Sequence, residues 1–126
     1  MLMPTVGEVQ FDMESVSNTL SGYRSKFSHK EEVAEPGYYK VKLQDDDIVA
    51  ELTSTPRVGF HKYSFPSTKE ANVVLDLTHG ISDEVDSLYL EIVSNTEISG
   101  FRESYEGLGG THKVFFIAKF SQPFKI

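Results

Sequence analysis

Two short runs near the middle of the chain place apolar side chains at every second position. They are residues 38–43, YYKVKL, and residues 48–53, IVAELT. A side-chain period of two is typical of a β-strand with one buried face. The acidic stretch 44–47, QDDD, lies between them, and aspartate favours turns because it bonds its own backbone locally. Residues 38–55 are therefore predicted to form a β-hairpin.

Similar patterns predict strands on both sides of this hairpin. An edge strand is expected around Val6–Phe11, and Val73–Leu75 is expected to be a strand buried on both faces. Gly100 lies inside a predicted strand, where glycine marks a bulge or a close backbone approach. The other strands are expected at residues 57–65, 71–77, 87–93, 96–103 and 112–120, and the loops at residues 12–25, 26–35, 78–86 and 105–111.

The spacing of these elements predicts the fold class. About seven or more short strands are separated by turn signals every 8–12 residues or so, and no amphipathic helix is evident. This pattern predicts an all-β fold, an antiparallel β-sandwich, and an all-β barrel is the alternative. The 126 residues are long enough for one domain with one core.

Composition excludes several classes of protein. The net charge is −7, and Lys and Arg are scattered among the acidic residues, so a nucleic-acid partner is not expected. The chain has no cysteine, which excludes disulfides and thiolate zinc sites. No apolar run approaches the roughly 18 residues that a membrane span needs, and residues 1–10 lack the pattern of a signal peptide.

Candidate catalytic and metal-binding residues are few. Ser28, His29 and the nearby Glu31, Glu32 and Glu35 combine a hydroxyl, an imidazole and carboxylates, but adjacency does not make a catalytic triad. Neighbouring Glu31 and Glu32 would diverge on an extended chain, which does not suit the paired carboxylates of a glycosidase. Residues 26–35 are more simply a solvated loop.

The remaining motifs favour structural roles. Residues 45–47, DDD, lack the glycine and the distant glutamate of a calcium loop, so a solvated hairpin turn is favoured. The histidines come from separate segments without metal-binding spacing, and His61 is expected to make a polar contact on the face it shares with Tyr63. Residues 107–110, GLGG, are not a phosphate loop. Tryptophan is absent and most aromatics fall on alternating core positions, so sugar stacking is not indicated.

Several longer segments carry a family resemblance. They are residues 27–43, FSHKEEVAEPGYYKVKL, residues 48–66, IVAELTSTPRVGFHKYSFP, and residues 71–79, ANVVLDLTH. With the opening LMPTVGEVQ and the closing KVFFIAKFSQPF, they resemble the N-terminal domain of glycoside hydrolase family 92, the bacterial α-mannosidases. Members are two-domain enzymes in which an N-terminal supersandwich-like β-sandwich packs on an (α/α)6 barrel, with the active site at the junction.

The resemblance implies a division of labour between the two domains. Family members are calcium-dependent inverting exo-α-mannosidases whose catalytic carboxylates and calcium ligands lie in the barrel. No catalytic residue, metal site or cofactor is therefore expected in these 126 residues. The expected partners are the barrel and, through the whole enzyme, mannose-containing glycans. The location implied is secreted, periplasmic or at the cell surface.

Within this chain, Ser28, His29 and Glu32 are expected to face the barrel and the substrate. Two departures from the family pattern matter. The loop ESYEGLGGTHK lacks the tryptophan that members often carry, and the barrel domain is missing. The chain also begins just after the position of a Gly/Ser/His/Thr-rich sugar-site loop of the family. We therefore expect a partial N-terminal domain that scaffolds and partly lines a mannoside site but does not hydrolyse mannosides alone.

Two other functions are compatible with the sequence. A free-standing carbohydrate-binding or adhesion module would bind mannosides saturably without a barrel. A purely structural interaction domain would present an exposed apolar patch. Unpaired strand edges would in addition favour self-association.

Overall fold

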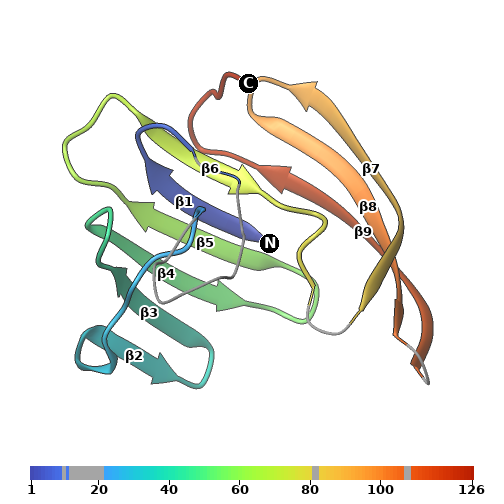
Figure 1. Cartoon of the computed structure of the whole chain (residues 1–126), viewed down its shortest axis with the longest axis horizontal. Coiled ribbons are helices and arrows are strands. Elements are labelled where there is room, and N and C mark those ends of the chain that lie inside the picture. The colour runs from blue at the N-terminus through green and yellow to red at the C-terminus, as the bar shows by residue number, and fades with distance from the viewer. Residues whose placement is uncertain (10, 12–21, 81–82, 107–108) are drawn as a thin grey trace. The chain divides into compact units, whose positions relative to one another are not determined.

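The computed structural model describes residues 1–9, 11, 22–80, 83–106 and 109–126, and β-strands dominate them (Figure 1). The six strand pairings are all antiparallel, and they form open sheets in the orders β1-β6, β2-β3-β4-β5 and β7-β8-β9. The predicted all-β antiparallel class is confirmed. The elements are β1 (Leu2–Val6), the 3-10 helix η1 (His29–Glu31), β2 (Glu32–Glu35), β3 (Tyr38–Leu43), β4 (Ile48–Ser54), β5 (Gly59–Ser64), β6 (Ala71–Leu75), β7 (Glu84–Ser94), β8 (Glu97–Glu106) and β9 (Gly110–Lys119).

The chain forms two compact units, residues 1–75 and residues 76–126. The first contains the two-stranded and the four-stranded sheets, and the second contains the three-stranded sheet. No helix among the described residues is long and apolar enough to cross a membrane.

The predicted hairpin at residues 38–55 is present as β3 and β4. Leu43 lies opposite Ile48, and Val41 lies opposite Ala50. These four side chains are buried and form the core of the first unit, against which Met3, Val6, Tyr39, Tyr63 and Phe65 pack. Asp47 in the turn has φ 53°, a left-handed conformation that aspartate tolerates because its short polar side chain bonds locally.

The prediction of a loop at residues 26–35 is wrong for residues 29–35. Residues 29–31 form η1, and β2 then pairs with β3 from Glu32 opposite Val41 to Glu35 opposite Tyr38. Gly37 has φ 81°, which lets the Pro36–Gly37 turn close tightly. The available edge of β3 therefore gives residues 32–35 backbone partners that their polar composition did not indicate. Charged side chains are tolerated because β2 is itself an edge strand.

The first strand also lies elsewhere than predicted. It covers Leu2–Val6 and is followed by Gly7, whose φ is 80° and whose N–H donates to Glu70 O. Pro4 is accommodated because, within the described part of the chain, β1 has β6 on one side and no strand on the other. Residues 12–21 of the predicted loop 12–25 lie outside the described residues.

The prediction that Val73–Leu75 is buried on both faces is wrong. In β6 only Val74 of these three is buried, and Val73 and Leu75 are half-buried. Among the residues that the structure describes, the strand pairs with β1 alone, in a two-stranded sheet. The apolar residues 73–75 are therefore buried on one face of the strand and only half-buried on the other.

The second unit is a sheet of three long strands. The predicted loop 105–111 is shorter than expected, because residues 105–106 continue β8 and residues 110–111 begin β9, while residues 107–108 lie outside the described residues. The close approach predicted at Gly100 is present. A Cβ atom there would lie 2.2 Å from Tyr89 O and 3.0 Å from the Phe116 ring. The register irregularities occur on β7 instead, at Val85/Ser87 and Ile92/Ser94.

Candidate functional site

Glu32 is the centre of a polar cluster at the start of β2. Its Oε1 accepts a hydrogen bond from Tyr39 Oη at 2.5 Å, and its Oε2 lies 2.5 Å from His29 Nδ1. The Glu32 side chain is 20% exposed, whereas that of His29 is 86% exposed. The cluster therefore has a half-buried carboxylate that ties an exposed imidazole to the sheet.

The local backbone explains why His29 and Glu32 meet. Ser28 is the N-cap of η1, and its Oγ accepts a hydrogen bond from Lys30 N at 3.3 Å. The single helical turn places residues 29 and 32 on the same side, at the i, i+3 spacing at which side chains are neighbours. The structure thus brings together the predicted His29 and Glu32, while the Ser28 hydroxyl caps the turn. Their role toward a partner or substrate stays a prediction.

Tyr39 belongs to this cluster and was not singled out in the sequence. Its place in an alternating strand indicated a core residue, and its ring does pack on the core of the first unit. The register of β2 and β3 places Glu32 opposite Val41, so Tyr39 is a diagonal neighbour on the same face. The contact between Tyr39 and Glu32 could have been predicted if a strand had been placed at residues 32–35. The polar composition of residues 26–35 gave no signal for that strand.

The cluster has a clear electrostatic consequence. The Tyr39 hydroxyl, and secondly His29, lower the pKa of the Glu32 carboxyl, and the same bond to Glu32 raises the pKa of Tyr39. Glu32 is therefore ionised and Tyr39 neutral around neutral pH. An ionised carboxylate accepts hydrogen bonds but has no proton to give, so Glu32 is suited to positioning and not to acid catalysis.

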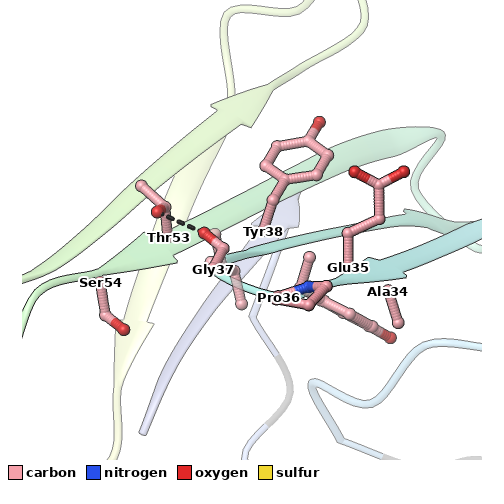
Figure 2. Close-up of a pocket in the computed structure, with 9 residues that line it drawn as sticks. Ala34, Glu35, Pro36, Gly37, Tyr38, Thr53 and Ser54 are labelled. Carbon is pink, nitrogen blue, oxygen red and sulfur yellow. Dashed lines mark hydrogen bonds between the residues drawn. The ribbon is translucent and has the colours of Figure 1, made fainter.

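An open pocket of about 460 Å³ lies beside this cluster, where the Pro36–Gly37 turn meets the end of β4 (Figure 2). Tyr39 is part of its lining, as are Glu35, Tyr38 and Thr53. Thr53 Oγ1 donates to Gly37 O at 2.6 Å, which fixes the turn against β4. Figure 2 shows the Tyr38 ring and the Glu35 carboxylate on the same side of the turn. The pocket is open, and two tyrosines and one glutamate are among the residues that line it.

The opposite face of the four-stranded sheet carries a second carboxylate cluster. Glu51 accepts hydrogen bonds from Tyr38 Oη and Lys62 Nζ, both at 2.8 Å. Lys62, and secondly Tyr38, lower the pKa of Glu51. Both oxygens of this carboxylate are engaged, so it too is ionised and structural.

The acidic turn at residues 45–47 has a structural role. Asp45 Oδ2 accepts from Lys26 N at 2.9 Å, Asp46 Oδ2 accepts from Val6 N at 3.1 Å, and Asp47 forms an ion pair with Lys42. These contacts tie the hairpin turn to the preceding chain, in agreement with the predicted turn. Over the same described residues, no group of three His, Asp or Glu side chains could hold a metal ion.

His61 has the polar contact that was expected. Its Nδ1 lies 2.7 Å from Tyr63 Oη, and the two rings meet edge to face. Partial burial lowers the pKa of His61, which favours the neutral imidazole. The histidine is therefore part of the packing of β5.

The three-stranded sheet exposes a large apolar surface. Strand alternation places Leu88, Leu90 and Ile92 of β7 on one face, together with Val114 of β9, and these side chains are 45–63% exposed. On the other face, the rings of Tyr89 and Phe101 stack at 6.0 Å, and Phe115 continues the row at 5.6 Å. A sheet with one solvated face normally alternates apolar and polar residues. This sheet carries exposed apolar side chains on both faces, although Lys113 and Glu103 lie beside the aromatic row on the second face.

Comparison with known proteins decides the family. The Glycosyl hydrolase family 92 N-terminal domain matches residues 1–126, the whole chain. The chain belongs to this family. The N-terminal domain of family 92 is therefore the context in which the Glu32 cluster and the apolar sheet have to be understood.

Two solved structures share this fold closely. Both are of a family GH92 alpha-mannosidase from Bacteroides thetaiotaomicron, and one of them is a complex with mannoimidazole. Each is 29% identical in sequence to this family 92 domain and superposes with a TM-score of 0.90 over 98% of it. The domain spans only 16% of that relative's chain. No curated protein matches it.

Proposed function

We propose that this family 92 domain is the non-catalytic part of an exo-α-mannosidase, where it scaffolds and partly lines a mannoside site completed by an (α/α)6 barrel. The observation that carries the proposal is the match of the whole chain to the family's N-terminal domain and to 16% of an α-mannosidase at a TM-score of 0.90. The calcium-dependent inverting chemistry belongs to the barrel in this proposal.

The state of the carboxylates supports a non-catalytic role. An inverting glycosidase needs one carboxyl group that stays protonated to donate to the leaving group. Glu32, Glu51 and Glu103 all bind hydrogen-bond donors, and their pKa values are lowered, not raised. They are ionised around neutral pH. None of the three has the properties of the general acid.

Calcium does not fit the carboxylates of this domain either. Calcium takes six to eight oxygen ligands or so. Asp45 and Asp46 each accept a backbone N–H group through Oδ2, and Asp47 pairs with Lys42 through Oδ1. Among the described residues, they do not form part of any group of three acidic or histidine side chains that could hold a metal ion. The barrel is therefore the proposed source of all calcium ligands.

The Glu32 cluster is the proposed contribution to the mannoside site. His29 extends from the sheet with its side chain 86% exposed, while Glu32 and the capped turn at Ser28 hold it in place. An exposed polar side chain that is held in one orientation by its neighbours is suited to contact a substrate hydroxyl or the barrel. Ser28, His29 and Glu32 are thus proposed to lie at the domain junction.

The three-stranded sheet is the proposed docking surface for the rest of the enzyme. Its exposed apolar side chains, among them Leu88, Leu90 and Ile92, form a larger patch than scattered surface residues would. The relative is about six times as long as this domain, so it contains ample polypeptide to cover such a surface. We therefore propose the remainder of a family 92 polypeptide as the occupant.

Assays of the isolated chain test the first part of the proposal. The purified 126 residues should release no mannose from an aryl α-mannoside or from mannobiose, with or without calcium. Titration with mannose and mannobiose, followed by amide shifts, should show no saturable binding. Mannose release would overturn the non-catalytic assignment, and saturable binding would favour the alternative, a free-standing carbohydrate-binding module.

A chimera tests the second part. The segment of the B. thetaiotaomicron enzyme that matches this chain is replaced by residues 1–126, and hydrolysis of an aryl α-mannoside is measured. Activity of the chimera, with none from either part alone, is the expected result. If the chimera folds, as judged by its melting curve, but has no activity, the scaffold assignment is wrong.

A further inference from the structure

The imidazole of His29 has one nitrogen engaged and one open. Nδ1 lies 2.5 Å from Glu32 Oε2, and the side chain is 86% exposed. Among the described residues, Nε2 makes no hydrogen bond. The ring meets Phe27 edge to face, with 5.4 Å between the centroids, which limits its rotation. One nitrogen therefore faces the sheet, and the other is presented outward.

The engaged nitrogen determines where the proton of the neutral imidazole resides. An ionised carboxylate only accepts hydrogen bonds, so the ring nitrogen beside it has to carry the proton. The proton is therefore assigned to Nδ1. In neutral His29 the exposed Nε2 then has a free lone pair and accepts hydrogen bonds.

Tyr39 holds Glu32 in the orientation that this arrangement needs. Its hydroxyl occupies Oε1, so Oε2 is the oxygen left for His29. The Tyr39 ring packs against the buried core cluster of the first unit. A chain of contacts thus runs from the core through Tyr39 and Glu32 to the imidazole. The carboxylate of nearby Glu31 accepts a hydrogen bond from Gln44 Nε2 at 2.8 Å, and the partner of His29 is Glu32.

We propose that Tyr39 and Glu32 are positioning residues that fix His29 as the Nδ1-protonated tautomer, so that Nε2 accepts a hydrogen bond from a glycan hydroxyl. The glycan part of this inference rests on the proposed function, whereas the tautomer does not. A metal ion is less suited to this site than a glycan hydroxyl, because a single histidine offers too few atoms to coordinate a metal.

The tautomer can be measured on the purified chain. Nitrogen-15 NMR of the histidine rings at a pH where they are neutral should show His29 protonated at Nδ1. Free exposed histidines favour protonation at Nε2, so His112 serves as the internal control. Glu32→Ala should return His29 to the tautomer of His112, and Tyr39→Phe should give a mixture. Unchanged amide spectra elsewhere would show that both variants fold.

Two results would overturn the positioning role. One is a wild-type His29 protonated mainly at Nε2, and the other is a tautomer that neither variant changes. Either result leaves the proposed scaffold function untouched, because that function is tested by the chimera.

The ligand is tested in an active chimera. His29→Ala should raise KM for the aryl mannoside at least several-fold with a smaller change in kcat, and Tyr39→Phe should raise KM less. His29→Gln, which offers an amide oxygen as an acceptor, should recover part of the lost affinity. Equal KM values for all variants would overturn the glycan contact while the scaffold function stands.

Discussion

Arg102 of β8 donates a hydrogen bond from Nη1 to Asp83 Oδ2 at 2.6 Å, and from Nε to Leu77 O at 2.8 Å. The Arg102 side chain is 20% exposed and that of Asp83 is 9% exposed. A Cβ atom on Gly80 would lie 1.8 Å from Asp83 Oδ1 and 2.8 Å from Arg102 Nη2. The backbone at Gly80 thus passes directly over the ion pair, which connects the segment before β7 to the middle of the sheet.

We expect Arg102→Ala to lower the melting temperature in a pH-dependent way. Arg102 is the main cause that lowers the pKa of Asp83 below its ordinary 3.8. A carboxyl group whose pKa is lower in the folded than in the unfolded protein stabilises the fold at any pH above its unfolded-state pKa. This stabilisation is lost as the pH falls through the folded-state pKa. The difference in Tm between wild type and variant should therefore be full at neutral pH and shrink below pH 3.8.

Arg102→Lys is the matched control for this ion pair, because it keeps the charge but loses the forked geometry. Its melting temperature should lie between those of the wild type and the alanine variant. A constant Tm difference between wild type and Arg102→Ala from neutral pH to pH 3 or so would contradict the linkage to Asp83.

Tyr39→Phe should raise the pKa of the Glu32 carboxyl more than His29→Ala does. The Tyr39 hydroxyl is the larger of the two influences that lower this pKa, and His29 is the second. Carbon-13 NMR of the glutamate carboxyl groups over an acid titration measures the effect. Glu103, which is bound by Ser87 and Lys113 in the other unit, should titrate alike in all three proteins. The reverse order of the two shifts would be evidence against the role assigned to Tyr39.

Gly100→Ala should destabilise the second unit. The added Cβ would lie 2.2 Å from Tyr89 O, a backbone atom that cannot move without disturbing β7. Overpacking of this kind costs about 1–3 kcal/mol. Denaturant unfolding monitored by tyrosine fluorescence gives the free energy. Ser99→Ala, at the neighbouring position, is the control and should stay within about 0.5 kcal/mol of wild type.

Ile48→Ala should be among the most damaging changes in the first unit. Ile48 has no exposed surface and lies opposite Leu43 in the core. Removing such a side chain typically costs about 2–5 kcal/mol, because the cavity collapses only partly. Val49→Ala, on the half-buried opposite face of β4, should cost clearly less in the same unfolding experiment. Equal losses would show that the two faces of the sheet are covered alike.

Phe115→Ser should improve solubility at little cost in stability. The side chain is 71% exposed in the apolar row of the three-stranded sheet. Replacing it should reduce binding of a hydrophobic dye and any self-association measured by analytical ultracentrifugation, while Tm changes little. A drop in Tm as large as that of Gly100→Ala would mean that Phe115 is covered within this chain.

The sequence predicted well those elements whose signal is local. The alternation in residues 38–43 and 48–53, with a three-aspartate turn between them, is sufficient to predict the hairpin, and the structure adds the register that places Leu43 opposite Ile48. The close approach at Gly100 was likewise predictable, because glycine weakens a strand and is favoured there mainly where another backbone comes near. These features depend on a few neighbouring residues and on side-chain periodicity.

The missed features depend on pairing between distant segments. β2 is polar and forms because the edge of β3 supplies backbone partners, which composition does not encode. Without that strand, the link from Tyr39 to Glu32 could not be predicted, although the sequence did point to Glu32 and His29. Likewise, β1 lies at residues 2–6 because β6 is its partner. Strand propensity alone could not place it.

The pairing of β1 with β6 has a consequence for synthesis of the chain. Asn72 Nδ2 donates to Gly7 O across 65 residues, and Leu2 lies opposite Leu75. The first strand therefore leaves the ribosome long before its partner exists, and β1 has to wait unpaired while the hairpin of β3 and β4 forms from neighbouring residues. Since such distant pairings form slowly, the pairing of β1 with β6 is expected to be the late step in folding of the first unit. Until it forms, the unpaired β1 segment is accessible to chaperones and proteases.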